Sequence, residues 1–171
     1  LASDIARFLD ALSVGRCHLI GAKYGGSISL QLASDQPQRF LSLCIFGSPA
    51  RGVGTGNADK IRAKGVRQWA AETMRSRLGS TASEAQLAWW TELMGATDQR
   101  AAYGSSSALV TMNLDDRLPL IKAPTLIVTT QESGLQSVEA VKAYARRFGD
   151  ARVIVLPGDS FHIAAVEPDL C

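Results

Sequence analysis

The sequence predicts an α/β protein built on a mostly parallel sheet. Short apolar runs of strand length alternate with amphipathic stretches of helical length, which is the order that β-α-β units produce. There are two such units, one on each side of a long region of helical composition. A chain of 171 residues is the size of one domain with a sizeable buried core, so we expect the helical region to be an insertion into one α/β domain.

The first unit is expected within residues 1–50. Apolar residues recur at helical spacing near its start, and Pro37 closes its second helix. The predicted elements, in order, are a helix over Ala2–Leu12, a strand over Cys17–Gly21, a helix over Tyr24–Ala33 and a strand over Leu41–Phe46. Two strands joined by one helix favour a right-handed parallel crossover.

The α/β pattern resumes in residues 119–171, after the helical insertion over residues 51–118. The insertion begins with a glycine-rich loop, and its helices are expected to break at Gly79-Ser80 and at Gly95. The elements predicted after it are a strand over Thr125–Thr130, a helix over Val138–Phe148 and a strand over Arg152–Leu156. We therefore expect residues 1–50 and 119–171 to form one core.

Composition and charge argue against several classes of partner. The formal net charge is +2 and the basic residues are scattered, which gives no support for nucleic-acid binding. No apolar stretch has the length of a membrane span and no secretory signal precedes the first helix, so no membrane partner is expected. The three cysteines form no CxxC pair, which favours free thiols and a cytoplasmic location.

The sequence contains no signal for a metal or another cofactor. No His, Cys, Asp or Glu cluster has metal-ligand spacing, and neither a dinucleotide loop nor a phosphate loop occurs. The adjacent carboxylates Asp115 and Asp116 are expected to be helix-cap or surface residues. We therefore expect any chemistry to come from the side chains alone.

The most informative motif is the turn "GAKYGG", which runs from Gly21 to Gly26. Its glycines have the frame of the G-x-S-x-G nucleophile elbow, in which the central residue holds a strained backbone between a strand and a helix. Small neighbours let the strand and the helix approach closely. Lys23 stands where that motif has its serine.

Three segments resemble the α/β-hydrolase superfamily in its esterase and 3-oxoadipate enol-lactonase branch. The helical insertion lies between the first segment and the other two. The first, "LDALSVGRCHLIGAKYGGSISLQLASDQPQRFLSLCIFGSPA", resembles the helix, elbow and following strand. The second, "DDRLPLIKAPTLIVTT", resembles the linker and strand that return from the lid, and "ARVIVLPGDSFHIAAVEPD" resembles the last strand and the loop with the catalytic histidine. The resemblance implies a hydrolase core with residues 51–118 as a helical lid over a substrate pocket.

The resemblance also assigns roles to individual residues. His162 falls at the catalytic histidine, and Lys23 falls at the nucleophile. The acid position falls at Ser133, with Glu132 beside it as a shifted candidate. Tyr24 follows the nucleophile position and would supply one backbone N–H of the oxyanion hole.

Lys23 leaves three interpretations of the site open. The lysine fills the old pocket and ends catalysis, or it binds an anion with help from the N-terminus of the next helix, or its amine attacks a carbonyl to form a Schiff base. Serine-type ester hydrolysis is not expected, because an acyl group on lysine is a stable amide.

We expect a small carbonyl or carboxylate ligand beneath the lid, against Trp69, Trp89 and Trp90. These tryptophans are first expected to pack within the lid, and the resemblance adds a role in lining the pocket. Two alternatives remain: a non-catalytic binding or interaction domain, and a carbonyl enzyme that depends on Lys23. Whether the chain is an enzyme therefore stays open at this point.

The family's first strands, and the loop that completes its oxyanion hole, would precede Leu1, so the resemblance implies truncation at the N-terminus. The strand Cys17–Gly21 is then expected at an exposed apolar edge of the sheet, which is a template for pairing with another chain. We expect association through this edge, either with a missing N-terminal segment or between copies as a homo-oligomer.

Overall fold

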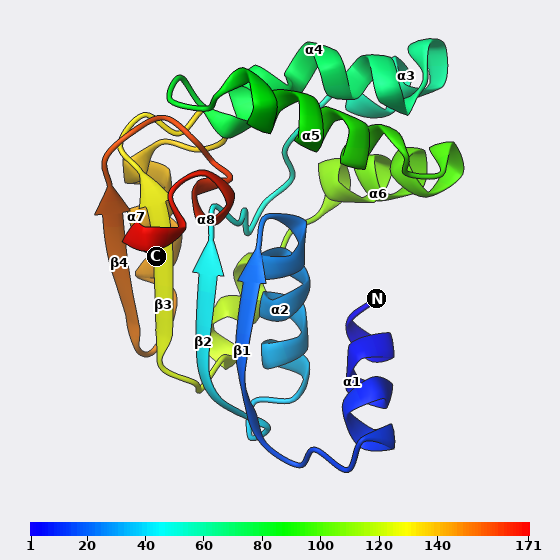
Figure 1. The fold of residues 1–171 in the computed structure, drawn as a ribbon. Helices are drawn as coiled ribbons and strands as arrows, with labels where there is room; N and C mark the ends of the chain where they lie inside the picture. The colour runs from blue at the N-terminus through cyan, green and yellow to red at the C-terminus, as the bar shows by residue number, and fades with distance from the viewer.

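In the computed structural model, which describes residues 1–171, four parallel strands form one sheet in the order β1-β2-β3-β4 (Figure 1). The strands are β1 (Cys17–Ala22), β2 (Phe40–Phe46), β3 (Thr125–Thr130) and β4 (Ala151–Leu156). The parallel α/β class and all four predicted strands are confirmed, and each strand end lies within one residue of its expected position.

Three helices and a 3-10 segment cover one face of this sheet. They are α1 (Ala2–Ala11), α2 (Tyr24–Asp35), η1 (Asp115–Leu120) and α7 (Val138–Ala145). Because every right-handed crossover moves in the same direction across the sheet, all the connections are placed on the same face. The apolar core lies between these layers, and its most deeply buried side chains include Leu30, Leu43, Ile45, Leu118 and Ile127.

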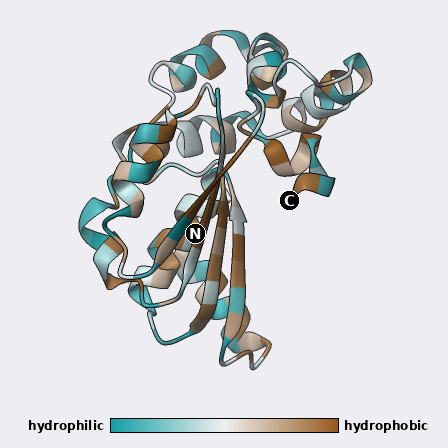
Figure 2. Cartoon of the chain, turned by 90° about the vertical axis from the view of Figure 1, so that its left-hand side faces the viewer, coloured by the Kyte–Doolittle hydropathy of each residue, from teal (hydrophilic) through white to brown (hydrophobic).

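The opposite face of the sheet is only partly covered, by α8 (Ile163–Val166) and η2 (Pro168–Leu170) near the C-terminus (Figure 1). The strands are apolar along much of their length in Figure 2. Ile20 of β1 is 72% exposed and Ile154 of β4 is 42% exposed on this open face. Within residues 1–171, β1 pairs with β2 alone and forms one end of the sheet.

Four helices form a layer across the carboxyl ends of the strands (Figure 1). They are α3 (Asn57–Lys64), α4 (Val66–Leu78), α5 (Glu84–Gly95) and α6 (Gln99–Thr111). The breaks expected at Gly79 and Gly95 are where α4 and α5 end. A further break at Gly65 separates α3 from α4, and its φ of 82° favours glycine. None of the helices in the chain is both long enough and apolar enough to cross a membrane.

Asp115 corrects an expectation, because it is a buried carboxylate and not a surface or cap residue. Its side chain accepts a hydrogen bond from Arg51, which begins the insertion, and one of 3.1 Å from Nη1 of Arg147, which follows α7. These arginines lie 64 and 32 residues away along the chain, so no local pattern announces the cluster. Its neighbour Asp116 is exposed, as expected.

Candidate active site

The turn between β1 and α2 has the backbone geometry of a nucleophile elbow. Lys23 has a φ of 56° and a ψ of −126°, in a region that residues other than glycine rarely adopt. Its backbone N–H donates to the Phe46 carbonyl oxygen at 2.9 Å, which fixes the turn against β2. A Cβ on Gly21 would lie 2.6 Å from Cα of Gly26, so this close approach of strand and helix requires glycine.

The side chain of Lys23 is largely buried beneath the helical layer. Nζ donates a hydrogen bond of 2.9 Å to the carbonyl oxygen of Gly47 and lies 3.9 Å from the centroid of the Phe161 ring. Burial, and next the positive charge of Arg77, lowers the pKa of the amine to about 6. At neutral pH, Lys23 therefore presents mainly an uncharged amine.

His162 lies on the loop after β4 and lines the same cavity as Lys23. Its backbone N–H donates to Oγ of Ser160 at 3.0 Å and to the carbonyl oxygen of Arg77 at 3.3 Å. The ring nitrogen Nε2 is buried and has no hydrogen-bond partner. Burial, followed by the charges of Lys23 and Arg77, lowers the pKa of the imidazole to about 3, so the ring is neutral.

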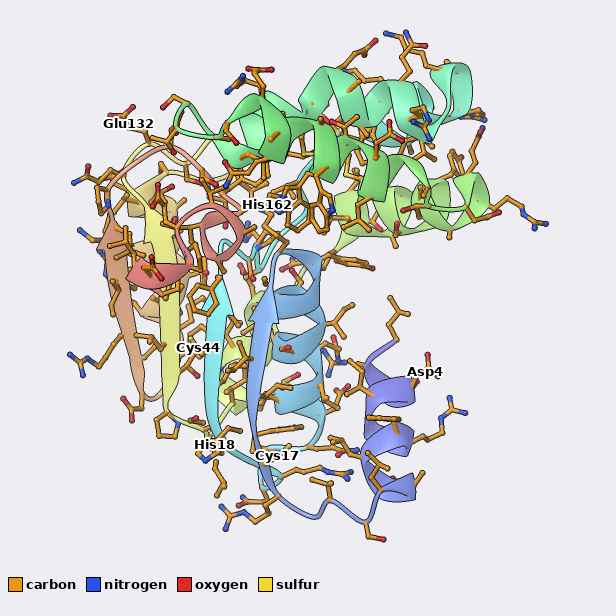
Figure 3. All side chains as sticks on the ribbon, in the orientation of Figure 1. Asp4, Cys17, His18, Cys44, Glu132 and His162 are labelled. Atoms are coloured by element: carbon orange, nitrogen blue, oxygen red, sulfur yellow. The ribbon has the colours of Figure 1, made fainter.

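The two candidates for the acid position do not reach His162. Glu132 is exposed, and its backbone N–H donates to the carbonyl oxygen of Gly158 at 3.0 Å. Figure 3 shows the Glu132 side chain at the outer edge of the molecule, apart from His162 beneath the helices. Oγ of Ser133 accepts a hydrogen bond of 3.4 Å from the backbone N–H of Leu135. Neither residue supplies the carboxylate that would make the imidazole more basic.

Tyr24 begins α2 and lines the cavity next to Lys23. The first N–H groups of a helix have no acceptor within the helix and lie at the positive end of its dipole. This is the position at which the resemblance places an oxyanion-hole N–H. The start of α2 therefore favours negative charge on whatever occupies the cavity.

A cavity of about 180 Å³ separates the elbow from the helical layer. Lys23 and His162 line its core side, and Trp69 and Arg77 line the side formed by α4. A second cavity, of about 300 Å³, shares Lys23, His162 and Phe161 with the first and is otherwise apolar. The amine of Lys23 thus lies between the first cavity, a compartment that Arg77 makes cationic, and the second cavity, which is apolar.

The three tryptophans of the helical layer take different positions. Trp69 lines the first cavity, and its Nε1 donates to Oδ1 of Asn57 at 3.2 Å. Trp90 lines the second, with its ring centroid 6.0 Å from that of His162. Trp89 is 59% exposed, lines neither cavity and packs edge-on against Trp90. Adjacent residues on one helix point in different directions, so Trp89 and Trp90 do not share the pocket.

Arg77 lines the cavity and was not predicted from the sequence. It lies in the last turn of α4, with its guanidinium carbon 4.7 Å from the centroid of the Trp69 ring. Nothing local distinguishes it from Arg75, which is exposed and pairs with Glu84. The difference depends on how α4 packs against the loop that carries His162, which is a tertiary feature without a sequence signal.

A strained elbow after a parallel strand, a histidine on the loop after the last strand and a cavity under a helical insertion are the features expected of the α/β-hydrolase architecture. The chain belongs to the α/β hydrolase fold family, whose family model matches residues 1–88. The family predicted from the three sequence segments is therefore confirmed.

Among known sequences, the chain is similar to the putative carbamate hydrolase RutD of Variovorax paradoxus (strain S110). The two are 28% identical over 172 residues, which cover 92% of this chain and 63% of that protein. The chain therefore spans 63% of the length of this relative.

Solved structures share the fold at lower identity. A hydrolase from Pseudomonas aeruginosa PA01 matches with a TM-score of 0.86 and 23% identity, and the match covers 99% of this chain and 67% of that one. The enol-lactonase from Burkholderia xenovorans LB400 matches with a TM-score of 0.86 and 21% identity over the same shares of the two chains. At these identities the likeness is one of fold.

Proposed function

We propose that this chain binds a small carbonyl or carboxylate compound in the cavity beneath the helical layer, without serine-type ester hydrolysis. The observation that carries the proposal is the place of Lys23, whose amine stands at the elbow and lines a cavity of about 180 Å³. Relatives named as an enol-lactonase and a putative carbamate hydrolase support a ligand with a carbonyl group. The cationic compartment and the start of α2 support a carboxylate.

The chemistry of the site argues against hydrolysis at this position. An acyl group transferred to the Lys23 amine would form an amide, which water does not readily remove. His162 is also a weak base, because its pKa is lowered to about 3 and neither Glu132 nor Ser133 contacts it. Binding of a ligand requires neither a leaving acyl group nor a strong base.

A second candidate function is addition of the Lys23 amine to a carbonyl. A neutral amine at the nucleophile position, with a pKa of about 6, favours this reaction. The Nζ lone pair would attack the carbonyl carbon while the π pair moves to oxygen. Proton transfer from nitrogen to oxygen and loss of water would then leave an imine.

Borohydride reduction in the presence of 2-pentanone tests this second candidate. Reduction converts an imine to a stable secondary amine, so peptide mass spectrometry is expected to find the pentyl adduct on Lys23. The variant Lys23→Met should give no adduct. An unmodified Lys23 in the wild-type protein would exclude the imine and leave non-covalent binding.

Hydrolysis of p-nitrophenyl acetate tests the loss of serine chemistry. We expect no turnover by the wild-type protein above that of Lys23→Ala. Activity gained by Lys23→Ser would indicate that the remaining site is intact around the missing hydroxyl. Activity in the wild type that survives Lys23→Ala would mean that the site is assigned to the wrong residues.

Ligand binding is tested by a two-dimensional NMR titration with pentanoate and with 2-pentanone. The expected shifts are confined to the backbone of Lys23 and His162 and to the indole N–H of Trp69, because these groups surround the cavity. If neither compound moves these signals, binding beneath the helical layer is wrong and an interaction domain becomes the better interpretation.

A further inference from the structure

Arg77 is a largely buried arginine without a counter-ion. Its side chain donates only one hydrogen bond within the chain, from Nε to Oγ1 of Thr73 at 3.1 Å, and it takes part in none of the ion pairs of the chain. The guanidinium lies over the Trp69 ring, and its two terminal nitrogens remain without an acceptor. The two terminal nitrogens are not among the fully buried polar atoms of the chain, so they remain available to an anionic ligand in the cavity that Arg77 lines.

The backbone fixes Arg77 relative to the rest of the site. Its carbonyl oxygen accepts hydrogen bonds from the N–H groups of Phe161 and His162, at 3.2 and 3.3 Å, and from Oγ of Ser160 at 3.2 Å. The end of α4 is therefore attached to the loop that carries the histidine. Arg77 and Lys23 both line the same cavity, from α4 and from the elbow.

We propose that Arg77 is a carboxylate-binding residue and that the cavity takes a keto acid, with the carboxylate on the guanidinium and the carbonyl towards the Lys23 amine. This assignment rests on the proposed function and names its ligand class. Two parallel N–H donors of a guanidinium match the two oxygens of a carboxylate. The guanidinium carbon lies 4.7 Å from the centroid of the Trp69 ring, and Nε is the one guanidinium nitrogen that donates within the chain.

The charge in the cavity selects a monoanion. Near neutral pH the amine of Lys23 and the ring of His162 are mainly uncharged, since burial lowers the pKa of the first to about 6 and of the second to about 3. Arg77 is then the one permanent cation of the compartment. One cation suits a carboxylate, whereas a phosphate dianion would need further donors.

The test compares three matched compounds, namely 4-oxopentanoate, 2-pentanone and pentanoate, by NMR titration of the wild-type protein. The keto acid is expected to bind about 10- to 100-fold more tightly than 2-pentanone, which lacks the carboxylate, because a bidentate charged pair is added. In Arg77→Met the affinity for the keto acid should fall to that for 2-pentanone. The affinity for 2-pentanone itself should change less than about twofold. Arg77→Lys should keep part of the preference.

Arg75→Met is the matched control, since Arg75 lies on the same helix and pairs with Glu84 outside the cavity. It should keep the full preference for the keto acid. If Arg77→Met does not fold, a measurement on the wild-type protein takes the place of this variant. Pentanoate should then shift the indole N–H signal of Trp69 more than 2-pentanone does.

The outcomes separate this inference from the proposed function. Equal binding of 4-oxopentanoate and 2-pentanone at the cavity, or a preference unchanged in Arg77→Met, would overturn the role of Arg77 and leave binding beneath the helical layer intact. If none of the three compounds shifts the cavity signals, both proposals fail together.

Discussion

Lys23 combines two unfavourable features that the rest of the fold must offset. Its backbone keeps the strained elbow conformation, at a cost of about 1–3 kcal/mol for a residue with a side chain. Its amine is also removed from water and faces the charge of Arg77 and the ring of His162. Both costs fall at the residue on which the proposed function depends.

The buried amine predicts an unusual pH dependence of stability. The unfolded chain holds the lysine proton up to the ordinary pKa of 10.5, whereas the folded chain releases it near 6. Between these values the unfolded state binds the extra proton, so stability should rise by about 1.4 kcal/mol per pH unit from this residue. His162 contributes no slope above its ordinary pKa of 6.5.

Urea unfolding of the wild-type protein and of Lys23→Met at several pH values between about 7 and about 9.5 measures this slope. The free energy of unfolding of the wild type should approach that of Lys23→Met as the pH rises, because the methionine variant has no proton to release. Parallel curves for the two proteins would contradict a pKa of Lys23 near 6.

The helical layer is held to the core at both of its ends by one polar cluster. The chain enters the layer at Arg51 and leaves it near Asn113, and these two residues form an isolated antiparallel bridge. The buried carboxylate of Asp115 joins Arg51 to Arg147 at the end of α7. We expect this cluster to help fix where the layer sits over the sheet.

Asp115→Asn should lower the free energy of unfolding at neutral pH by about 1–3 kcal/mol, because a buried carboxylate loses charged hydrogen bonds. The side-chain hydrogen bond from Arg51, and then the charges of Arg51 and Arg147, lower the pKa of Asp115. Its contribution is therefore present above the ordinary pKa of 3.8 and is lost as the pH falls through the lower, folded value.

Asp116→Asn is the control for this prediction, since Asp116 is exposed and contacts Arg147 alone, at 3.3 Å. It should change the free energy of unfolding by less than about 1 kcal/mol. Denaturant unfolding of both variants checks the pair, and equal effects would show that the Arg51–Asp115–Arg147 cluster does not fasten the layer.

At the scale of the whole molecule, the strands, the elbow and the position of the histidine follow from periodic apolar runs and one glycine frame. These signals are local, and they predict elements to within a few residues. The neighbours of His162 depend on packing between distant segments, which explains why Glu132 was expected near it and Arg77 was not. Asp115 was misjudged for the same reason, since both of its partners are remote in sequence.

The sheet itself carries the last prediction. Its strand order places every crossover on one face and leaves the other partly open, with Ile20 exposed on the edge strand β1. Parallel sheets are normally covered on both faces, and an apolar edge pairs readily with another chain. We expect the polypeptide of residues 1–171 to self-associate through β1, as the exposed edge predicted from the sequence implies.

Analytical ultracentrifugation at micromolar concentration should give a mass above the 18.2 kDa of one chain. Ile20→Lys should shift the protein towards the monomer, because a charge on the open face opposes pairing. Leu93→Lys, at an exposed position on α5, should leave the association unchanged. A wild-type monomer, or equal effects of the two lysines, would mean that the edge of β1 does not mediate contact between copies.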